Sequence, residues 1–281
     1  MKTFDIRCPA KINLSLDVVS RRADGYHNLS MIMHQINLFD ILTLEMTEGN
    51  GIILTSTDPS VPTDDSNLII KAAKTFFEKT GISASARIHL HKSIPMGAGL
   101  GGGSTDAAGT LTALNTMFDT PLTIDELAVT AKTLGADVPF FLHGGCMLAE
   151  GIGEILSPLP PLSNVYILLA KPSVSVSTAY VYKNLVLDES IKHPDTKSAI
   201  TALETGDLDL LASSCGNVLE TVTAIEYPEI EEYKNILLSH GAAYSLMSGS
   251  GSSVFGIFAD KKSAETAYNN FKNITPFTYL V

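Results

Sequence analysis

The chain has 281 residues, of which 45% are hydrophobic, and carries a net charge of −11 at neutral pH. This length supports a large core and favours two domains, whereas the acidic balance argues against a nucleic-acid partner. The three well-separated cysteines form no Cys-x-x-Cys pair, so neither a disulfide framework nor a zinc site is expected. The first residues, Met1-Lys-Thr-Phe-Asp-Ile6, contain no apolar signal core, and no apolar run is long enough to span a membrane. We therefore expect a cytoplasmic protein that acts away from membranes.

The first half of the chain predicts a mixture of strands and helices. A helix is expected to open at Ser66 and to close at Gly81, because its apolar residues lie on one face. The capping box Thr123-Ile-Asp-Glu126 predicts a further helix that ends at Gly135. Alternation of apolar and polar residues predicts strands at residues 12–18, 36–46 and 86–94.

The second half predicts the order β-α-β-β-α-β of ferredoxin-like domains, with one extra helix. The Pro-rich stretch Pro158-Leu-Pro-Pro161 is typical of a hinge, so we expect one domain at residues 1–157 and a second at residues 158–281. The expected elements are strands at 165–170, 243–247, 254–258 and 277–280, and helices at 208–222, 230–238 and 263–271.

The most informative segment is Pro95-Met-Gly-Ala-Gly-Leu-Gly-Gly-Gly-Ser-Thr-Asp106. A helix is predicted directly behind it, with Ser104, Thr105 or Asp106 as its N-cap. Backbone N–H groups and the positive end of the helix dipole would converge there, so the segment predicts an anion site whose hydroxyls reach phosphate oxygens. A tight turn that binds nothing is the simpler alternative.

The segment does not match other phosphate loops. No Lys follows the glycines, so it is not a Walker A motif. Gly97-Ala-Gly-Leu-Gly-Gly102 fits the dinucleotide pattern literally, but that pattern requires a buried parallel strand in front of it. The preceding strand alternates as if half-exposed and is broken by Pro95, so the dinucleotide interpretation lacks its context.

Two charged residues are candidates for catalysis. Lys11 interrupts an apolar strand, where it is either a snorkelling surface side chain or a cation that stabilises a transferred phosphate. Asp137 follows a predicted helix end and precedes Pro139, so it is either a helix N-cap or a functional carboxylate.

Other candidates lie in turns and on one strand face. The turn Asp24-Gly-Tyr-His27 presents an aromatic pair that could stack on a base. The loop Ser248-Gly-Ser-Gly-Ser252 is either a plain hairpin or a second oxyanion-binding loop. His89 and His91 share a strand face, but no third metal ligand is in view, so they are interpreted as solvent-facing.

Three motifs, taken in order, resemble the GHMP kinase superfamily of galactokinase, homoserine kinase and mevalonate kinase. They are Pro9-Ala-Lys-Ile-Asn-Leu14, the segment from Pro95 to Thr105, and Met247-Ser-Gly-Ser-Gly-Ser252. The resemblance implies an α+β, two-domain GHMP kinase fold: a ribosomal protein S5 domain 2-like N-terminal domain and a ferredoxin-like C-terminal domain, with the active site in the cleft between them.

Three further stretches are similar to one branch of that superfamily: Arg22-Ala-Asp-Gly-Tyr-His27, Leu134-Gly-Ala-Asp-Val-Pro139 and Pro172-Ser-Val-Ser-Val-Ser-Thr178. This branch uses ATP to phosphorylate the 2-hydroxyl of a cytidine-diphosphate-linked methylerythritol, in the non-mevalonate route to isoprenoid precursors. The resemblance therefore implies ATP as phosphate donor, Mg²⁺, and a monomer or homodimer. It does not place the Mg²⁺ ligands, because no counterpart of the acidic ligand of mevalonate kinases is found.

Carried over residue by residue, the resemblance makes Asp137 the catalytic base and Lys11 its partner at the acceptor hydroxyl. Thr105 replaces a common Ser, and Ala98 a common Gly. The implied ATP-binding residues are Asn67, at the adenine, and Pro95, Met96, Gly97, Ala98, Gly99, Leu100, Gly101, Gly102, Gly103, Ser104 and Thr105. The implied substrate-binding residues are Asn13, Tyr26, His27, Thr178 and Tyr182, with the two tyrosines on opposite faces of the cytosine.

Two rival functions remain at this stage. Another GHMP kinase, such as a homoserine or mevalonate kinase, would have no reason to carry Tyr26 and Tyr182 as a cytosine sandwich. A non-catalytic sugar or nucleotide sensor on the same fold would be expected to lose its base, whereas Asp137 and Lys11 are both present.

Overall fold

The computed structural model describes residues 3–49 and 51–281, so Met1 and Lys2 of the N-terminal stretch considered above lie outside it. The chain divides into two compact units built from interleaved segments. Unit 1 contains the residues up to 10, 37–96 and 101–144, and unit 2 contains 11–36, 97–100 and 145–281. Two long strands, β1 (Thr3–Arg21) and β2 (His27–Thr47), contribute residues to both units. The predicted domain division after residue 157 stays a prediction.

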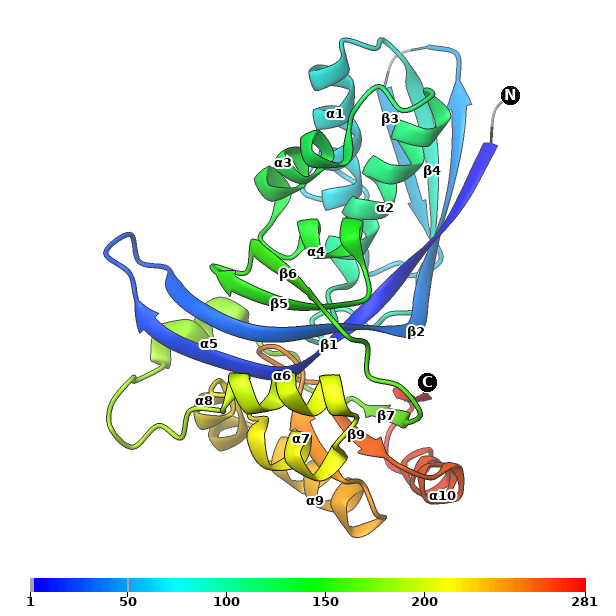
Figure 1. Ribbon diagram of the computed structural model, residues 1–281. Helices are drawn as coiled ribbons and strands as arrows, with labels where there is room; N and C mark the ends of the chain where they lie inside the picture. The colour runs from blue at the N-terminus through cyan, green and yellow to red at the C-terminus, as the bar shows by residue number, and fades with distance from the viewer. Residues whose placement is uncertain (1–2, 50) are drawn as a thin grey trace. The chain divides into compact units, whose positions relative to one another are not determined.

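Unit 1 is a layer of strands covered by helices. The end of β2 pairs antiparallel with β4, and β4 pairs parallel with β3, while the helices lie together on one side of these strands (Figure 1). Leu42, Ile88, Phe76 and Leu111 belong to the core between the two layers. The elements of unit 1 are β3 (Gly51–Ser56), α1 (Leu68–Thr80), β4 (Ser85–His91), α2 (Gly102–Met117), α3 (Ile124–Leu134) and α4 (Val138–His143).

Local sequence determines where these helices begin. The predicted capping box at Thr123 is confirmed, since both of its reciprocal bonds are present. Helix α1 begins one residue later than expected, because Asn67 and not Ser66 occupies the N-cap position. The predicted N-cap of α2 is wrong: Gly101, in the left-handed region at φ +74°, turns the chain directly into the helix. Ser104 and Thr105 therefore lie inside the first turns of α2.

Unit 2 contains an antiparallel sheet in the order β10-β7-β9-β8, with α9 and α10 packed on it (Figure 1). This order confirms the predicted ferredoxin-like arrangement and, with unit 1, the α+β class. The start of β2 pairs with β5, and β5 pairs with β6. The elements of unit 2 are β5 (Cys146–Gly151), β6 (Ile155–Leu159), β7 (Tyr166–Ala170), α5 (Thr178–Asn184), α6 (Thr196–Thr205), α7 (Leu208–Ser214), α8 (Glu220–Glu226), α9 (Glu229–Ser239), β8 (Tyr244–Met247), β9 (Val254–Phe258), α10 (Lys261–Phe271) and β10 (Thr278–Leu280).

One expectation for this half is wrong. The single helix predicted at 208–222 is two helices, α7 and α8, because residues between them bond to β1 instead: Leu16 N–H donates to Gly216 O and Val218 N–H donates to Leu16 O. The Pro-rich stretch begins inside β6, a strand whose one described neighbour is β5, and an edge strand tolerates proline; the hinge expected there stays a prediction. No helix in the described ranges combines the length and the apolarity needed to cross a bilayer.

Candidate active site

Within unit 2, half of the glycine-rich segment is fixed by backbone contacts. Lys11 N–H donates to Leu100 O at 3.0 Å, and Ser253 N–H donates to Ala98 O at 3.2 Å. The Ser248 hydroxyl donates to Gly99 O at 2.9 Å. Gly99 has φ +73°, and a Cβ built there would overlap the carbonyl oxygen of Ser248. Glycine is therefore required at this position both by conformation and by close approach, and the hairpin loop at 248–253 contacts the glycine-rich segment.

Lys11 lies in β1 and its side chain is enclosed. The residue is 4% exposed, so it is not the snorkelling surface lysine of the simpler interpretation. Its ammonium donates to Asn13 Oδ1, and Asn13 N–H donates to the Ser248 hydroxyl at 3.3 Å. The structure thus brings two of the predicted site residues, Lys11 and Asn13, together with the glycine-rich segment and the second glycine-serine loop.

Within unit 1, the other half of the segment forms the start of α2. Thr105 N–H makes the first intrahelical bond, to Gly101 O at 2.9 Å. Helix geometry leaves the N–H groups of Gly102, Gly103 and Ser104 without intrahelical acceptors, and they carry the positive end of the helix dipole. An anion placed there would meet three converging donors.

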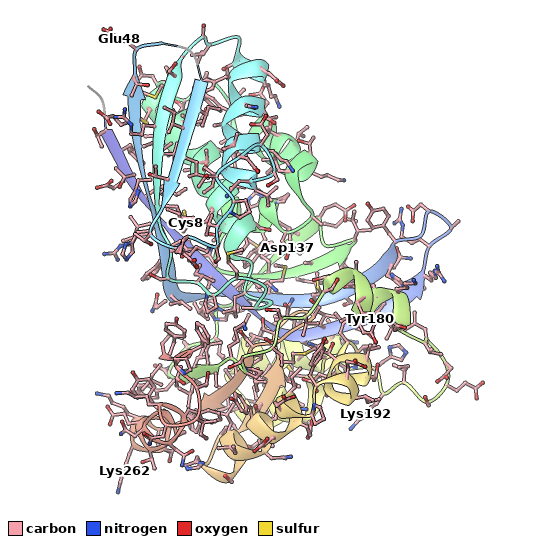
Figure 2. All side chains as sticks on the ribbon, turned by 180° about the vertical axis from the view of Figure 1, so that it is seen from behind. Cys8, Glu48, Asp137, Tyr180, Lys192 and Lys262 are labelled. Atoms are coloured by element: carbon pink, nitrogen blue, oxygen red, sulfur yellow. The ribbon has the colours of Figure 1, made fainter. Side chains whose placement is uncertain are left out.

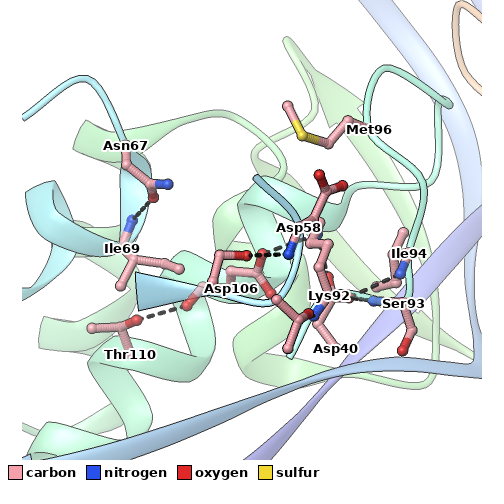
Figure 3. Close-up of polar contacts among 12 residues, drawn as sticks. Asp40, Asp58, Asn67, Ile69, Lys92, Ser93, Ile94, Met96, Asp106 and Thr110 are labelled. Atoms are coloured by element: carbon pink, nitrogen blue, oxygen red, sulfur yellow. Dashed lines mark hydrogen bonds and ion pairs between the residues drawn. The ribbon is translucent and has the colours of Figure 1, made fainter. Parts of the chain in front are cut away.

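Asn67 already has a structural role. Its Oδ1 accepts from Ile69 N–H at 2.8 Å as the N-cap of α1 (Figure 3), and its Nδ2 donates to Pro62 O at 2.6 Å. The predicted adenine contact stays a prediction. Met96, in the predicted phosphate-binding segment, is 43% exposed, and its predicted contact with ATP stays a prediction.

Asp137, labelled in Figure 2, stands at the N-cap position of α4, and its side chain makes no capping bond. Pro139 occupies the first turn of that helix, where its missing N–H costs nothing. The carboxylate therefore does not cap α4, and the catalytic role of Asp137 stays a prediction.

Among the other predicted substrate residues of unit 2, one pair is in contact, Thr178 contacts the second glycine-serine loop, and Tyr26 lies in an exposed turn. The rings of His27 and Tyr182 lie with their centroids 5.2 Å apart, and Thr178 Oγ1 hydrogen-bonds Ser250 Oγ at 2.7 Å. Burial, with the charge of Arg21, lowers the pKa of His27. Tyr26 is 62% exposed in the predicted turn. The stacking of Tyr26 opposite Tyr182 and the pairing of Asp137 with Lys11 stay predictions.

Two residues that support the site were not found from the sequence. Asn217 Nδ2 donates to Met247 O at 2.7 Å and to Gly249 O at 2.8 Å, so it holds the second glycine-serine loop. Lys171 donates to Pro172 O at 3.1 Å and Val174 O at 2.9 Å, and burial lowers its pKa. Lys171 directly precedes the stretch Pro172–Thr178, and this position was the one signal in the sequence that could have identified it. Among the described residues no group of three or more His, Cys, Asp or Glu could hold a metal ion.

Comparison with known proteins first shows the superfamily to which the chain belongs. The family model of the GHMP kinases N terminal domain matches residues 67–145, and that of the GHMP kinases C terminal region matches residues 199–274. The homoserine kinase of Cytophaga hutchinsonii shares the fold, with a TM-score of 0.79 at 21% identity over 100% of this chain and 93% of that one. The fold and the two matches are those of the GHMP kinases, small-molecule kinases that use ATP.

Relatives with higher sequence identity identify the family within this superfamily. The chain is 46% identical to the 4-diphosphocytidyl-2-C-methyl-D-erythritol kinase of Lachnoclostridium phytofermentans, over 97% of this chain and 94% of the relative. It is 44% identical to that of Alkaliphilus metalliredigens, over 100% and 97%. A crystal structure of 4-(cytidine 5'-diphospho)-2C-methyl-D-erythritol kinase matches with a TM-score of 0.84 at 34% identity, covering 99% of this chain and 98% of the other. The chain therefore belongs to the family of 4-diphosphocytidyl-2-C-methyl-D-erythritol kinases.

Proposed function

We propose that this chain transfers the γ-phosphoryl group of ATP to the 2-hydroxyl of 4-diphosphocytidyl-2-C-methyl-D-erythritol, in the cytoplasm, as a step toward isoprenoid precursors. The observation that carries the proposal is the enclosed Lys11, which Asn13 orients beside the glycine-rich segment. A buried cation beside an anion-binding segment is suited to stabilising charge that develops during phosphoryl transfer.

The reaction divides between the two charged residues. Asp137 accepts the proton of the 2-hydroxyl as its oxygen forms a bond to the γ-phosphorus, and the bond from that phosphorus to the bridging oxygen breaks, releasing ADP. Lys11 offsets negative charge on the attacking oxygen and the transferred group. A tertiary alcohol is a crowded nucleophile, so in-line orientation supplies much of the rate.

The nucleotide half of the acceptor provides that orientation. Tyr26 and Tyr182 stack on the two faces of the cytosine, and His27, Asn13 and Thr178 complete the pocket. Base stacking on aromatic side chains contributes about 1–3 kcal/mol per contact, and this energy holds the distant hydroxyl in place. A homoserine or mevalonate acceptor has no base to stack.

The phosphates of ATP are bound by the segment from Pro95 to Thr105, with Asn67 at the adenine. Mg²⁺ supplied with the nucleotide would neutralise phosphate charge. Because no cluster of candidate ligands is present among the described residues, we assign no side chain to the ion.

The test is an ATP-coupled assay over three acceptors: the cytidyl substrate, homoserine and mevalonate. We expect ADP release with the cytidyl substrate alone, and a phosphorylated product confirmed by mass spectrometry. Lys11→Met should abolish turnover, whereas Lys262→Met, which removes an exposed lysine from α10 (Figure 2), should leave it unchanged. Turnover of homoserine or mevalonate in place of the cytidyl substrate would refute the proposal.

A further inference from the structure

A buried charge cluster lies at the base of the glycine-rich segment in unit 1 (Figure 3). It consists of Asp40 from β2, Lys92 just after β4, and Asp106 from α2. The side chains are 0%, 6% and 4% exposed. Lys92 Nζ donates to Asp40 Oδ2 and, at 3.2 Å, to Asp106 Oδ2.

This cluster contacts both ends of the segment. Asp40 Oδ1 accepts from Ser93 N–H at 2.6 Å and from Ile94 N–H at 2.8 Å, immediately before Pro95. At the other end, a Cβ built on Gly102, the first residue of α2, would lie 2.9 Å from Lys92 Nζ. The ammonium therefore packs directly against the backbone that begins the helix.

The charges of the cluster do not balance if both acids are ionised. Two carboxylates would face one ammonium, leaving a net negative charge buried beneath a segment that is expected to bind phosphates. Asp106 Oδ1 has no hydrogen-bond partner among the described residues, which is costly for a buried anion. The geometry thus favours an uncharged Asp106.

Electrostatics agree with this geometry. Burial raises the pKa of Asp106 to about 8, with the charge of Asp40 adding to the shift and that of Lys92 opposing it. Burial alone would lower the pKa of Lys92, but the charges of Asp106 and Asp40 outweigh it and raise the pKa. Burial raises the pKa of the Cys8 thiol in β1, and the charges of Asp106 and Asp40 raise it further, so the thiol stays neutral.

We propose that Asp40, Lys92 and Asp106 are positioning residues that fix both ends of the phosphate-binding segment, with Asp106 as the neutral acid that keeps the cluster uncharged. This inference rests on the proposed function, because it assumes that the segment binds ATP. The Asp40–Lys92 pair holds the backbone before Pro95 and supports Gly102 from below. The proton on Asp106 prevents the cluster from repelling the phosphates.

The first test is the affinity for MgATP of Asp40→Asn, measured by calorimetric titration of the full chain. This change keeps an oxygen for the two backbone donors but removes the ion pair, so the dissociation constant should rise at least about tenfold, or 1.4 kcal/mol. The matched control is Glu45→Gln on β2, the strand that also carries Asp40. This change removes the exposed ion pair between Glu45 and Arg87. This variant should bind MgATP within about twofold of wild type.

The KM values separate positioning from general destabilisation. In Asp40→Asn, the KM for ATP should rise more than the KM for the acceptor, whereas a loosened fold would weaken both. A folded Asp40→Asn variant that binds MgATP as tightly as Glu45→Gln would overturn the positioning role.

The second test compares wild type with Asp106→Asn across pH, and it remains decisive even if Asp40→Asn does not fold. At about pH 6.5 both should bind MgATP within about twofold of each other, since Asn replaces a neutral acid of the same shape. At about pH 9 wild type should bind at least about fivefold more weakly than Asp106→Asn, because its carboxyl has ionised. Comparing the two proteins at each pH cancels the titration of ATP itself.

A constant affinity ratio across this pH range, or much weaker binding by Asp106→Asn at about pH 6.5, would overturn the neutral-acid assignment.

Thermal unfolding provides an independent readout of the protonation of Asp106. Because the folded-state pKa of Asp106 lies above the unfolded value, its contribution to stability is lost as pH rises from about 4 to about 8, and Asp106→Asn should remove that loss. If wild type bound no MgATP, the proposed function would fall as well; if wild type bound and Asp40→Asn matched it, this inference alone would fall.

Discussion

The strongest structural prediction concerns two glycines of the same segment that differ in their surroundings. Gly97 and Gly99 both have left-handed backbones, with φ +58° and +73°. A Cβ on Gly97 would meet one described atom within 4 Å, Ser175 Oγ at 3.9 Å, whereas a Cβ on Gly99 would overlap the backbone carbonyl of Ser248. Alanine at either site therefore costs backbone strain, but at Gly99 it must also displace a neighbouring main chain.

The two costs can be separated by magnitude. A left-handed alanine costs about 1–2 kcal/mol, which corresponds to roughly a 5- to 30-fold loss of the competent conformation in Gly97→Ala. Gly99→Ala must in addition break the bonds from Ser248 Oγ to Gly99 O and from Gly251 N–H to Ser248 O. At about 0.5–1.5 kcal/mol each, these losses lower kcat/KM by roughly a further 5- to 150-fold.

The assay is kcat/KM for ATP in both variants, with circular dichroism to confirm folding. Gly97→Ala serves as the control for backbone strain, since both variants share it. Equal losses in the two variants would mean that the contact with Ser248 is irrelevant to nucleotide binding, and the reasoning would be refuted.

Four further predictions follow from single side chains. Asp137→Asn should lower kcat by roughly 10² or more with MgATP affinity retained, measured by steady-state kinetics and titration, because Asn occupies the same helix position but accepts no proton. Tyr26→Ala and Tyr182→Ala should each raise KM for the cytidyl substrate by roughly 5- to 150-fold with little change for ATP, since stacking contributes about 1–3 kcal/mol. Asn67→Ala should lower the free energy of unfolding by about 1 kcal/mol in urea, whereas Asn67→Asp retains the cap of α1. Burial lowers the pKa of His34, so denaturation should show stability falling as pH drops below about 6.5, and His34→Gln should flatten that slope.

The fold was predictable where local signals decide it. The capping box at Thr123 acts through bonds to immediate neighbours, and Gly81 ends α1 with a left-handed backbone at φ +69°; both predictions are confirmed. The start of α2 was missed because Gly101 initiates it through a left-handed backbone and not through a capping side chain. The break between α7 and α8 was missed because it depends on bonds to Leu16, about two hundred residues away in the chain.

The candidate site was also predictable only where local signals decide it. Glycine density and the motif order identified the segment at 95–105, but they could not say which glycine is required by contact and which by conformation alone. Gly99 and Gly102 each face a specific atom, Ser248 O and Lys92 Nζ, and only the folded arrangement identifies these partners. Asp40, in the middle of a strand pattern, was a visible signal of a buried charge that sequence reasoning did not use.

The absence of a lysine after the glycines, which excluded a Walker A motif, now has a structural counterpart. Lys92 precedes the glycines, but its ammonium is held by Asp40 and Asp106 beneath the segment, so it is not available as a mobile phosphate ligand. Charge on a phosphate bound at the start of α2 would then be met by the N–H groups of that first turn. Because the lysine is fixed below the backbone, it acts on the shape of the segment, and we expect nucleotide affinity to depend on the geometry of these N–H donors.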